Sequence, residues 1–376
     1  MKNPLIELEK FGQSVWLDNI SRDMLIRGEL EKLRDEDGLK GVTSNPSIFQ
    51  KAMGSGHAYD EQIKEILTAN PDISAEELFE ILAVKDIQDA TDVLKVVYDN
   101  KKGNDGFVSI EVSPELAYDT ARTIAEAARL HRKVGRPNVM IKIPAAQEGL
   151  PAIRKMISEG VCINVTLIFS PTVYEQVVGA YISGLEDRVK KGESIKNISS
   201  VASFFISRID SAVDKELEAK GNKELQGKIA IANAKLVYQK AKKLFSSPRF
   251  RELEKAGAKK QRLLWASTST KNPAYPDVLY VEELIGRDTV NTLPPATLEA
   301  YRDHGNPVDP PSGEAGRIET KLDEAKAQMK KIAELGIDFE AVTRKLTDDG
   351  VILFADSYRD LIKAIERKKT EVLQTV

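Results

Sequence analysis

Short apolar segments alternate with longer amphipathic segments along most of the chain. Eight of the short segments have the length and the β-branched or aromatic content of buried strands, and they cover residues 13–18, 40–45, 107–112, 139–144, 161–170, 200–207, 262–268 and 288–293. Strand–helix alternation repeated about eight times is typical of parallel β/α units, and eight units close a barrel. The pattern therefore predicts an α/β protein with a (β/α)8 TIM barrel fold.

Two of the amphipathic segments have recognisable helix ends. Residues 113–135 begin with Ser113-Pro114, a cap residue followed by proline at the first helical position, and they end near Gly135. The segment PAIRKMISEG ends at Gly160 in the same way. We therefore expect one helix over 113–135 and a second helix that closes at residue 160.

Two regions depart from the simple alternation. Residues 50–105 contain no apolar strand and are rich in charge, so we expect helices inserted after the second strand, as a flap near the barrel mouth or a subunit contact. A Pro/Gly-rich loop at 306–316 precedes helices at about 317–370, which we expect to pack on the outside of the barrel. We therefore predict a single domain over residues 1–376 with these two helical additions.

Composition narrows the class of protein. The formal charge of −3 gives no global attraction to nucleic acid or an anionic membrane, and no apolar stretch approaches the ~20 residues of a membrane helix. The first residues lack the apolar run of a signal peptide, and the single cysteine, Cys162, suits a reducing compartment. We expect a cytoplasmic protein without a nucleic-acid or membrane partner, as a monomer or a homodimer.

Polar side chains recur late in successive predicted strands, where a β/α barrel carries its chemistry. They are Asp18, Asn45, Glu111, Lys142, Asn164, Thr166, Ser203, Arg208, Ser267 and Lys271. Each has a structural explanation when taken alone: Asp18, Asn45 and Arg208 lie at junctions where such residues form turns or cap helices, and Glu111 with Lys142 could be a structural ion pair. A packed core does not need the whole collection, whereas a polyhydroxylated substrate does.

Lys142 suggests what this collection could do. It lies in the strand segment VMIKIP, among aliphatic residues, and burial disfavours the charged form of an amine. A neutral amine can form a Schiff base with a ketone, which turns the ketone into an electron sink for cleavage of the adjacent carbon–carbon bond. Asp18 and Glu111 could then handle the protons of bond cleavage and of Schiff-base formation. Ser203, Arg208 and Lys271 suggest an oxyanion site, with phosphate as the first candidate.

Signals for metals and nucleotides are weak. The three histidines, His57, His131 and His304, are scattered singly without the spacing of metal ligands. GSGH at 54–57 lacks the Lys-Ser/Thr of a P-loop, and no G-x-G-x-x-G follows a predicted strand. We expect neither a metal nor another cofactor.

Several of these segments together resemble the transaldolase family. The similar segments are GVTSNPSIF, VSIEVSPELAYD, MIKIPAA, INVTLIFS and SFFISRID, which occur in the family's order between about residues 13 and 300. The length of the chain and the excursion at 50–105 resemble the longer bacterial transaldolases. The resemblance implies a (β/α)8 barrel that moves a dihydroxyacetone unit between sugar phosphates in the pentose phosphate pathway. Sedoheptulose 7-phosphate or fructose 6-phosphate would be the donor, and glyceraldehyde 3-phosphate or erythrose 4-phosphate the acceptor.

The resemblance also implies catalytic roles. Lys142 would form the Schiff base, and Asp18 would be the acid/base at the breaking bond. Glu111, with a water held by Thr166, would shuttle protons during Schiff-base formation and hydrolysis.

The remaining matched residues would bind substrate. Asn45 and Asn164 would orient the three-carbon unit, and Ser203, Arg208 and Lys271 would hold the phosphate. Lys271 is a departure, since many relatives have arginine where this chain has lysine in ASTSTKN. Lysine keeps the charge but loses the bidentate fork of arginine.

Two other functions compete with transfer. A lyase of the fructose-6-phosphate aldolase type would release free dihydroxyacetone, and it would form product without an acceptor aldehyde. A non-enzymatic scaffold would bind phosphosugars with Lys142 as a structural ion-pair member, and it would form no covalent adduct.

Overall fold

The computed structural model describes residues 3–54, 56–307 and 316–373, and within them eight parallel strands form a closed barrel in chain order. The strands are β1 (Gln13–Asp18), β2 (Gly41–Thr43), β3 (Phe107–Glu111), β4 (Val139–Pro144), β5 (Ile163–Ile168), β6 (Ser200–Phe205), β7 (Arg262–Ala266) and β8 (Thr289–Leu293). Pairing of β1 with β8 closes the barrel. The predicted barrel and all eight strands are confirmed; β1 and β4 have the predicted bounds, and the others are shorter.

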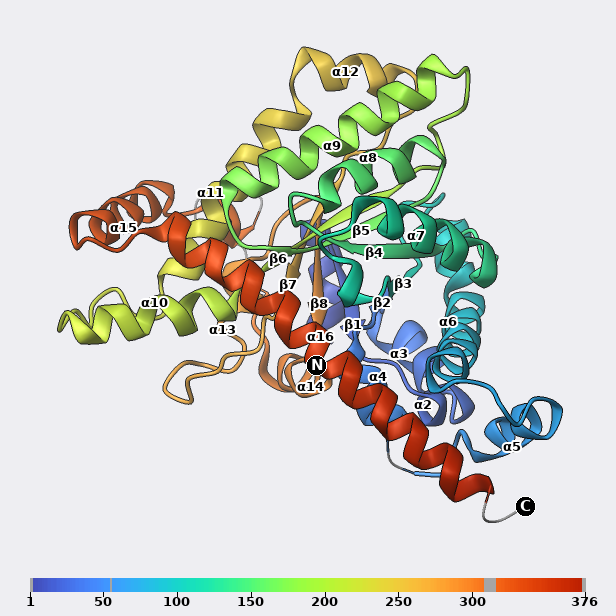
Figure 1. The fold of residues 1–376 in the computed structure, drawn as a ribbon. Helices are drawn as coiled ribbons and strands as arrows, with labels where there is room; N and C mark the ends of the chain where they lie inside the picture. The colour runs from blue at the N-terminus through green and yellow to red at the C-terminus, as the bar shows by residue number, and fades with distance from the viewer. Residues whose placement is uncertain (1–2, 55, 308–315, 374–376) are drawn as a thin grey trace.

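Helices surround the barrel, as Figure 1 shows. They are α1 (Pro4–Glu7), α2 (Arg22–Ile26), α3 (Glu29–Asp37), α4 (Pro46–Met53), α5 (Asp60–Ala69), α6 (Ala75–Asn100), α7 (Thr120–Val134), α8 (Gly149–Ser158), α9 (Pro171–Lys190), α10 (Ser207–Ala219), α11 (Ile229–Phe245), α12 (Pro248–Lys255), α13 (Leu279–Glu283), α14 (Pro295–His304), α15 (Leu322–Glu334) and α16 (Phe339–Leu373), with short 3₁₀ turns η1 (Leu8–Phe11), η2 (Pro114–Leu116) and η3 (Arg317–Glu319). No helix of the described residues is long and apolar enough to cross a membrane. Most of the predicted loop at 306–316 lies outside the described residues.

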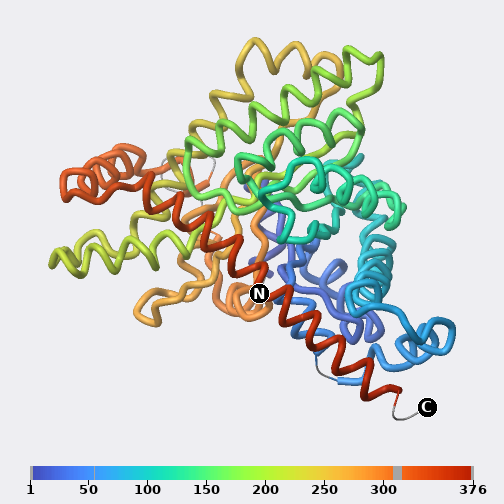
Figure 2. Tube along the Cα trace, in the orientation of Figure 1, coloured from blue at the N-terminus to red at the C-terminus, as the bar shows by residue number. Residues whose placement is uncertain are grey.

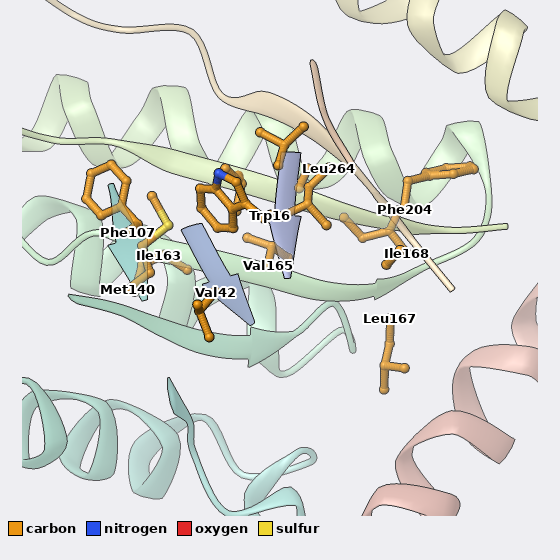
Figure 3. Close-up of a cluster of buried hydrophobic side chains, with 14 of the residues drawn as sticks. Trp16, Val42, Phe107, Met140, Ile163, Val165, Leu167, Ile168, Phe204 and Leu264 are labelled. Atoms are coloured by element: carbon orange, nitrogen blue, oxygen red, sulfur yellow. The ribbon is translucent and has the colours of Figure 1, made fainter. Parts of the chain in front are cut away.

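Large apolar side chains from the strands fill the core (Figure 3). Trp16 of β1 is fully buried, and a Cβ on Gly41 of the neighbouring β2 would lie 2.3 Å from its ring. Any side chain at position 41 would therefore displace the indole. Close packing of this kind makes the barrel a filled core rather than a pore.

The register of three neighbouring strands sets up the site. Glu111 of β3 pairs with Lys142 of β4, and Lys142 pairs with Asn164 of β5. Residues that pair across parallel strands point to the same face of the sheet. Glu111, Lys142 and Asn164 therefore form one row around the barrel, which the stagger of the strands takes from the last residue of β3 to the second residue of β5.

The stretch 50–105 combines most of α4 with α5 and α6. The long helix α6 begins with a capping box between Ser74 and Glu77 and packs against β3, α3 and α7, which is the position of an ordinary barrel helix. Helix α5 packs against α6 and α16 and lies further out (Figure 1). The stretch therefore includes the barrel's own helix between β2 and β3 together with an added helical segment.

The predicted start of the helix over 113–135 is wrong. Ser113 and Pro114 introduce only the single turn η2, and α7 begins later, where the side chain of Asp119 accepts a hydrogen bond from the backbone N–H of Arg122. The side chain of Ser113 makes no capping hydrogen bond to η2, whereas Asp119 caps α7. The predicted end is confirmed, with Gly135 in the left-handed conformation.

The expectation that both C-terminal helices pack on the outside is wrong for α16. This helix runs across the mouth of the barrel (Figures 1 and 2), where it packs against α4, α10, η2 and β5. Its buried residues Gly350, Val351 and Phe354 face the barrel. The end of the barrel that carries the site is therefore covered by the last helix of the chain.

Candidate active site

A cavity of about 130 Å³ lies at the carboxyl ends of the strands. It is lined by Asp18, Thr43, Asn45, Lys142, Thr166, Ser203, Phe205, Arg208, Ala266, Ser267, Ser269, Lys271, Thr292, Pro294 and Phe354. Seven of the nine site residues predicted from the sequence line this cavity. The other two, Glu111 and Asn164, contact residues that line it. The structure thus brings the predicted residues together in one place.

Lys142 is buried, with 5% of its surface exposed, and several groups compensate its charge. Its Nζ donates a hydrogen bond to the backbone carbonyl of Ser44 at 3.2 Å and lies 3.6 Å from Oε2 of Glu111. The same Nζ lies 5.5 Å from the ring centre of Phe354, which is a cation–π distance. The amine is therefore held toward the cavity by weak contacts that a covalent bond to a substrate can replace.

Glu111 is the only carboxylate within ion-pair distance of Lys142 among the described residues. Both its carboxylate oxygens are buried without a hydrogen-bond partner in the part of the chain that the structure describes. Burial raises the pKa of Glu111 to about 7, against the opposing charge of Lys142 and with a smaller raising effect from Asp18. A carboxyl group with this pKa can both donate and accept a proton near neutral pH.

Asp18, at the end of β1, is the second carboxylate of the site. Its Oδ1 accepts a hydrogen bond of 2.6 Å from the hydroxyl of Thr43, which in turn lies 2.7 Å from the hydroxyl of Thr292. Burial raises the pKa of Asp18, while Lys142, the Thr43 hydroxyl and Lys271 act in the opposite direction. The two carboxyl groups thus differ in their hydrogen bonds, since Asp18 is bonded to Thr43 whereas Glu111 has no hydrogen-bond partner among the described residues.

An interior row of polar side chains fixes the orientation of Asn164. Its Nδ2 donates to the hydroxyl of Ser109 at 3.0 Å, and its Oδ1 accepts from the hydroxyl of Ser203 at 2.7 Å. The hydroxyl of Thr166 is buried and has no partner among the described residues. An unpartnered buried hydroxyl that lines a cavity can hold a water molecule or a substrate hydroxyl.

Asn45 has a structural role as well as a place in the cavity wall. Its side chain caps α4 by accepting a hydrogen bond of 3.0 Å from the backbone N–H of Ile48. The capping contact uses Oδ1, so the amide N–H₂ group is left for the cavity that Asn45 lines.

Two cations form the other end of the cavity. Arg208 follows β6 and has neither a hydrogen bond nor an ion pair among the described residues, although its guanidinium lies 5.4 Å from the ring centre of Phe205 and 5.9 Å from that of Phe354. Burial lowers the pKa of Arg208. Burial also lowers the pKa of Lys271, and the positive charge of Arg208 lowers it further. Lys271 Nζ donates to the hydroxyl of Ser269 at 2.8 Å. A half-buried guanidinium without an anionic partner, next to an ammonium, suits an oxyanion such as phosphate.

Two strand ends at the site have unusual backbone conformations. Leu167 in β5 has φ of 60° at a register shift between Val165 and Ile168, and Ser267 after β7 has φ of 56°. Residues with side chains rarely adopt this left-handed conformation, and it is concentrated at functional sites. The shift in β5 includes Thr166, which lines the cavity.

Sequence reasoning missed seven cavity residues: Thr43, Phe205, Ala266, Ser269, Thr292, Pro294 and Phe354. The strand-end rule that selected Asp18 could have found both threonines, since Thr43 pairs with Asp18 in register and Thr292 is the last residue but one of β8. Phe205 lies two residues after Ser203, on the same face of β6 by the period of two. Phe354 belongs to α16, and no local signal links that helix to the site.

A second cavity, of about 450 Å³, lies beside the first among α4, α6, α7 and α16. Among its charged lining residues, Arg129 pairs with Glu80 and Glu126, and Lys133 pairs with Glu80. Glu111 also lines this second cavity and pairs with Lys142 of the first. No group of three His, Cys, Asp or Glu side chains among the described residues could hold a metal ion.

Comparison with known proteins gives a consistent result. The model of the transaldolase/fructose-6-phosphate aldolase family matches residues 15–365. A transaldolase of Trichodesmium erythraeum is 46% identical, over 97% of this chain and 97% of its own length. A transaldolase of Thiobacillus denitrificans is 46% identical, over 96% of this chain and 98% of its own. A transaldolase of a Parafrankia species is 46% identical, over 98% of both chains.

Proposed function

This chain belongs to the transaldolase/fructose-6-phosphate aldolase family, and we propose that it is a transaldolase that moves a dihydroxyacetone unit from a ketose phosphate to an aldose phosphate. The donor is sedoheptulose 7-phosphate or fructose 6-phosphate. The acceptor is glyceraldehyde 3-phosphate or erythrose 4-phosphate. Full-length similarity to transaldolases supports the reaction, and the cavity supports the assignment of residues to its steps.

One observation carries the assignment of residues. A buried amine, with a single carboxylate 3.6 Å away, shares a small cavity with a guanidinium that has no carboxylate partner among the described residues. The amine can react with the ketone at one end of a sugar phosphate, and the guanidinium can bind the phosphate at the other end. A structural ion pair between Glu111 and Lys142 would explain the amine and its carboxylate but not the guanidinium in the same cavity.

The first half-reaction begins at Lys142. Glu111 accepts a proton from the ammonium, the neutral amine adds to the C2 ketone, and the carbinolamine loses water with Glu111 returning a proton. Thr166, whose hydroxyl has no hydrogen-bond partner in the described part of the chain, holds the water that links Glu111 to the carbinolamine oxygen. The product of this step is a protonated Schiff base on Lys142.

Cleavage then needs the second carboxylate. Asp18 accepts the proton of the C4 hydroxyl while the C3–C4 bond breaks, and the bonding electrons pass to the Schiff base as an enamine. The shortened aldose phosphate leaves from the end that holds Arg208, Lys271 and Ser203. Asn45 and Asn164 orient the hydroxyls of the three-carbon unit that stays on Lys142. An acceptor aldehyde reverses these steps, and hydrolysis frees the new ketose phosphate.

Borohydride reduction with fructose 6-phosphate, followed by peptide mass mapping, tests the proposal. We expect a three-carbon or six-carbon adduct on Lys142, together with product formation that requires an acceptor aldehyde. An adduct on another lysine would overturn the residue assignment but keep the chemistry. Absence of any adduct in folded protein that binds the sugar would leave a phosphosugar scaffold. Acceptor-independent release of dihydroxyacetone as the main reaction would instead assign the lyase function.

A further inference from the structure

Three polar contacts hold helix α16 across the mouth of the barrel. Tyr118 donates a hydrogen bond to Asp348 at 3.3 Å, the Ser47 hydroxyl donates to that of Ser357 at 2.9 Å, and Lys368 lies 2.7 Å from Asp60. These contacts come from the segment after η2, from α4 and from the start of α5, and α4 and α5 lie along the C-terminal half of α16 (Figure 1). These contacts therefore fix the position of the middle of α16 over the cavity.

Gly350 allows the helix to come this close. A Cβ at position 350 would lie 2.8 Å from Cδ2 of Leu167 and 3.6 Å from Nη1 of Arg208. Leu167 has the left-handed backbone conformation at the shift in β5, and its side chain points away from the other labelled side chains of the core (Figure 3). Because position 350 is glycine, α16 can pack closely against the irregular end of β5, the strand that carries Thr166.

One turn further along, Phe354 faces the cavity. It is 6% exposed, and its ring centre lies 5.5 Å from the Lys142 amine and 5.9 Å from the Arg208 guanidinium carbon. The ring therefore lies near both anchors of the proposed substrate: the group that binds its ketone carbon and the group that binds its phosphate. A sugar chain that joins these two anchors has to pass along the face of this ring.

We propose that Phe354 is a specificity-determining residue that covers the bound three-carbon unit and excludes water from it, and thereby favours transfer over release of dihydroxyacetone. The inference rests on the proposed function, because it needs an enamine on Lys142. An apolar ring above that carbon offers no proton and leaves no room for ordered water. An acceptor aldehyde, whose phosphate binds Arg208, can still enter along the ring.

The two fates of the enamine differ in what its nucleophilic carbon receives. In transfer, that carbon forms a bond to the aldehyde carbon of the acceptor, and the aldehyde oxygen takes a proton from Asp18. In release, the same carbon takes a proton that water supplies, and a second water hydrolyses the Schiff base to dihydroxyacetone and the free amine. Water access to this carbon therefore sets the ratio of the two products.

The test compares Phe354→Ala and Phe354→Leu with wild type in two assays on the full chain. One assay measures transfer from fructose 6-phosphate to erythrose 4-phosphate, and the other measures dihydroxyacetone released without an acceptor. We expect the ratio of release to transfer to rise about tenfold in Phe354→Ala and less in Phe354→Leu, which keeps more apolar volume. Ile352→Ala, on the exposed side of the same helix at 56% exposure, is the matched control and should leave the ratio unchanged.

Borohydride trapping on Lys142 separates the possible failures. If wild type forms the adduct but both activities of Phe354→Ala fall in the same proportion, Phe354 only supports the fold and the inference is overturned. The same conclusion follows if the ratio in Phe354→Ala equals that of wild type. If wild type forms no adduct on Lys142, the proposed function itself fails, and this inference fails with it.

Discussion

Both ends of the barrel bury charged side chains, but the two ends differ in whether these side chains have hydrogen-bond partners within the protein. At the amino end, Asp105 accepts hydrogen bonds from the Ser14 hydroxyl, from Trp16 Nε1 at 2.7 Å and from Arg262 Nη1 at 3.1 Å. Arg262 also donates to the backbone carbonyl of Thr289 at 2.6 Å. At the carboxyl end, the Glu111 oxygens have no hydrogen-bond partner among the described residues, and neither does the Arg208 guanidinium.

This difference separates structure from function within one fold. A buried polar network stabilises a protein when each of its members has a partner, and an unpartnered member lowers stability. The network of Asp105, Ser14, Trp16 and Arg262 at the amino end meets this condition and links β1, β7 and β8. The carboxyl end leaves hydrogen-bonding capacity unused, and a substrate with a ketone, hydroxyls and a phosphate can use it. The following substitutions test this distinction, from the largest expected effect to the smallest.

Lys142→Met should abolish activity while leaving the fold intact. We expect a loss of kcat/KM of at least ~10⁴-fold, because the nucleophile is removed. The free energy of unfolding should stay within about 1 kcal/mol of wild type, since Glu111 can become neutral when its partner is gone. Steady-state kinetics and urea unfolding measure the two quantities.

A lysine near the amino end provides the matched control for this substitution. Lys259 is partly buried and donates to the backbone carbonyls of Gly103 at 2.7 Å and Lys102 at 3.1 Å. Lys259→Met should lower stability by about 1 kcal/mol and leave kcat/KM unchanged. Equal loss of activity in both variants would contradict the distinction between the two ends.

Asp105→Asn should lower stability and leave activity unchanged, which is the opposite of the result expected for Lys142→Met. It leaves Arg262 without its buried counter-charge, so we expect the free energy of unfolding to fall by about 3 kcal/mol. The kcat per folded molecule should be unchanged, because the cavity lies at the other end of the barrel. Urea unfolding and active-site titration by borohydride trapping measure the two effects. A proportionate loss of kcat with no change in stability would show that the amino end takes part in the reaction.

Glu111→Gln should change how stability depends on pH. The pKa of Glu111 is raised from an ordinary value of 4.5 to about 7, so the folded protein binds this proton more tightly than the unfolded chain does. The free energy of unfolding of wild type should therefore fall as pH rises from about 4.5 to 7, by about 3 kcal/mol from this group. Glutamine has no proton to lose, so this part of the decline should disappear in the variant.

The comparison is made by urea unfolding of both proteins across this pH range. Parallel curves for wild type and Glu111→Gln would mean that the burial of Glu111 has no energetic consequence. The variant should also form the borohydride-trapped adduct about 100-fold more slowly, because it cannot exchange a proton with the amine.

Sequence reasoning found the barrel and most of the site because both depend on local patterns. The period of two within strands and the carboxyl-end rule select Glu111, Lys142 and Asn164, and the structure places these three in one register row. The predicted helix start at Ser113 was wrong because Ser113 and Asp119 are both favourable N-cap residues. The sequence alone does not show which of the two caps the helix.

The cover of the site could not be predicted in this way. Phe354 reaches Lys142 only because α16 crosses the barrel, and that path depends on Gly350 fitting against Leu167. Nothing in the helical spacing of α16 distinguishes this course from one along the outside. Contacts between segments far apart in the chain depend on tertiary packing, which local propensity does not encode.

Arg208→Met tests the phosphate end of the cavity and should have the smallest effect on the fold. We expect KM for fructose 6-phosphate to rise about 100-fold, because charge-assisted hydrogen bonds to a phosphate are lost. The free energy of unfolding should stay equal or rise by about 1 kcal/mol, since the variant removes a largely buried charge that has no ion-pair partner among the described residues. Lys271→Met should raise KM less, because Lys271 is more exposed and already bonds Ser269. Unphosphorylated fructose is the control substrate, and an equal rise in its KM would assign Arg208 to the sugar rather than to the phosphate.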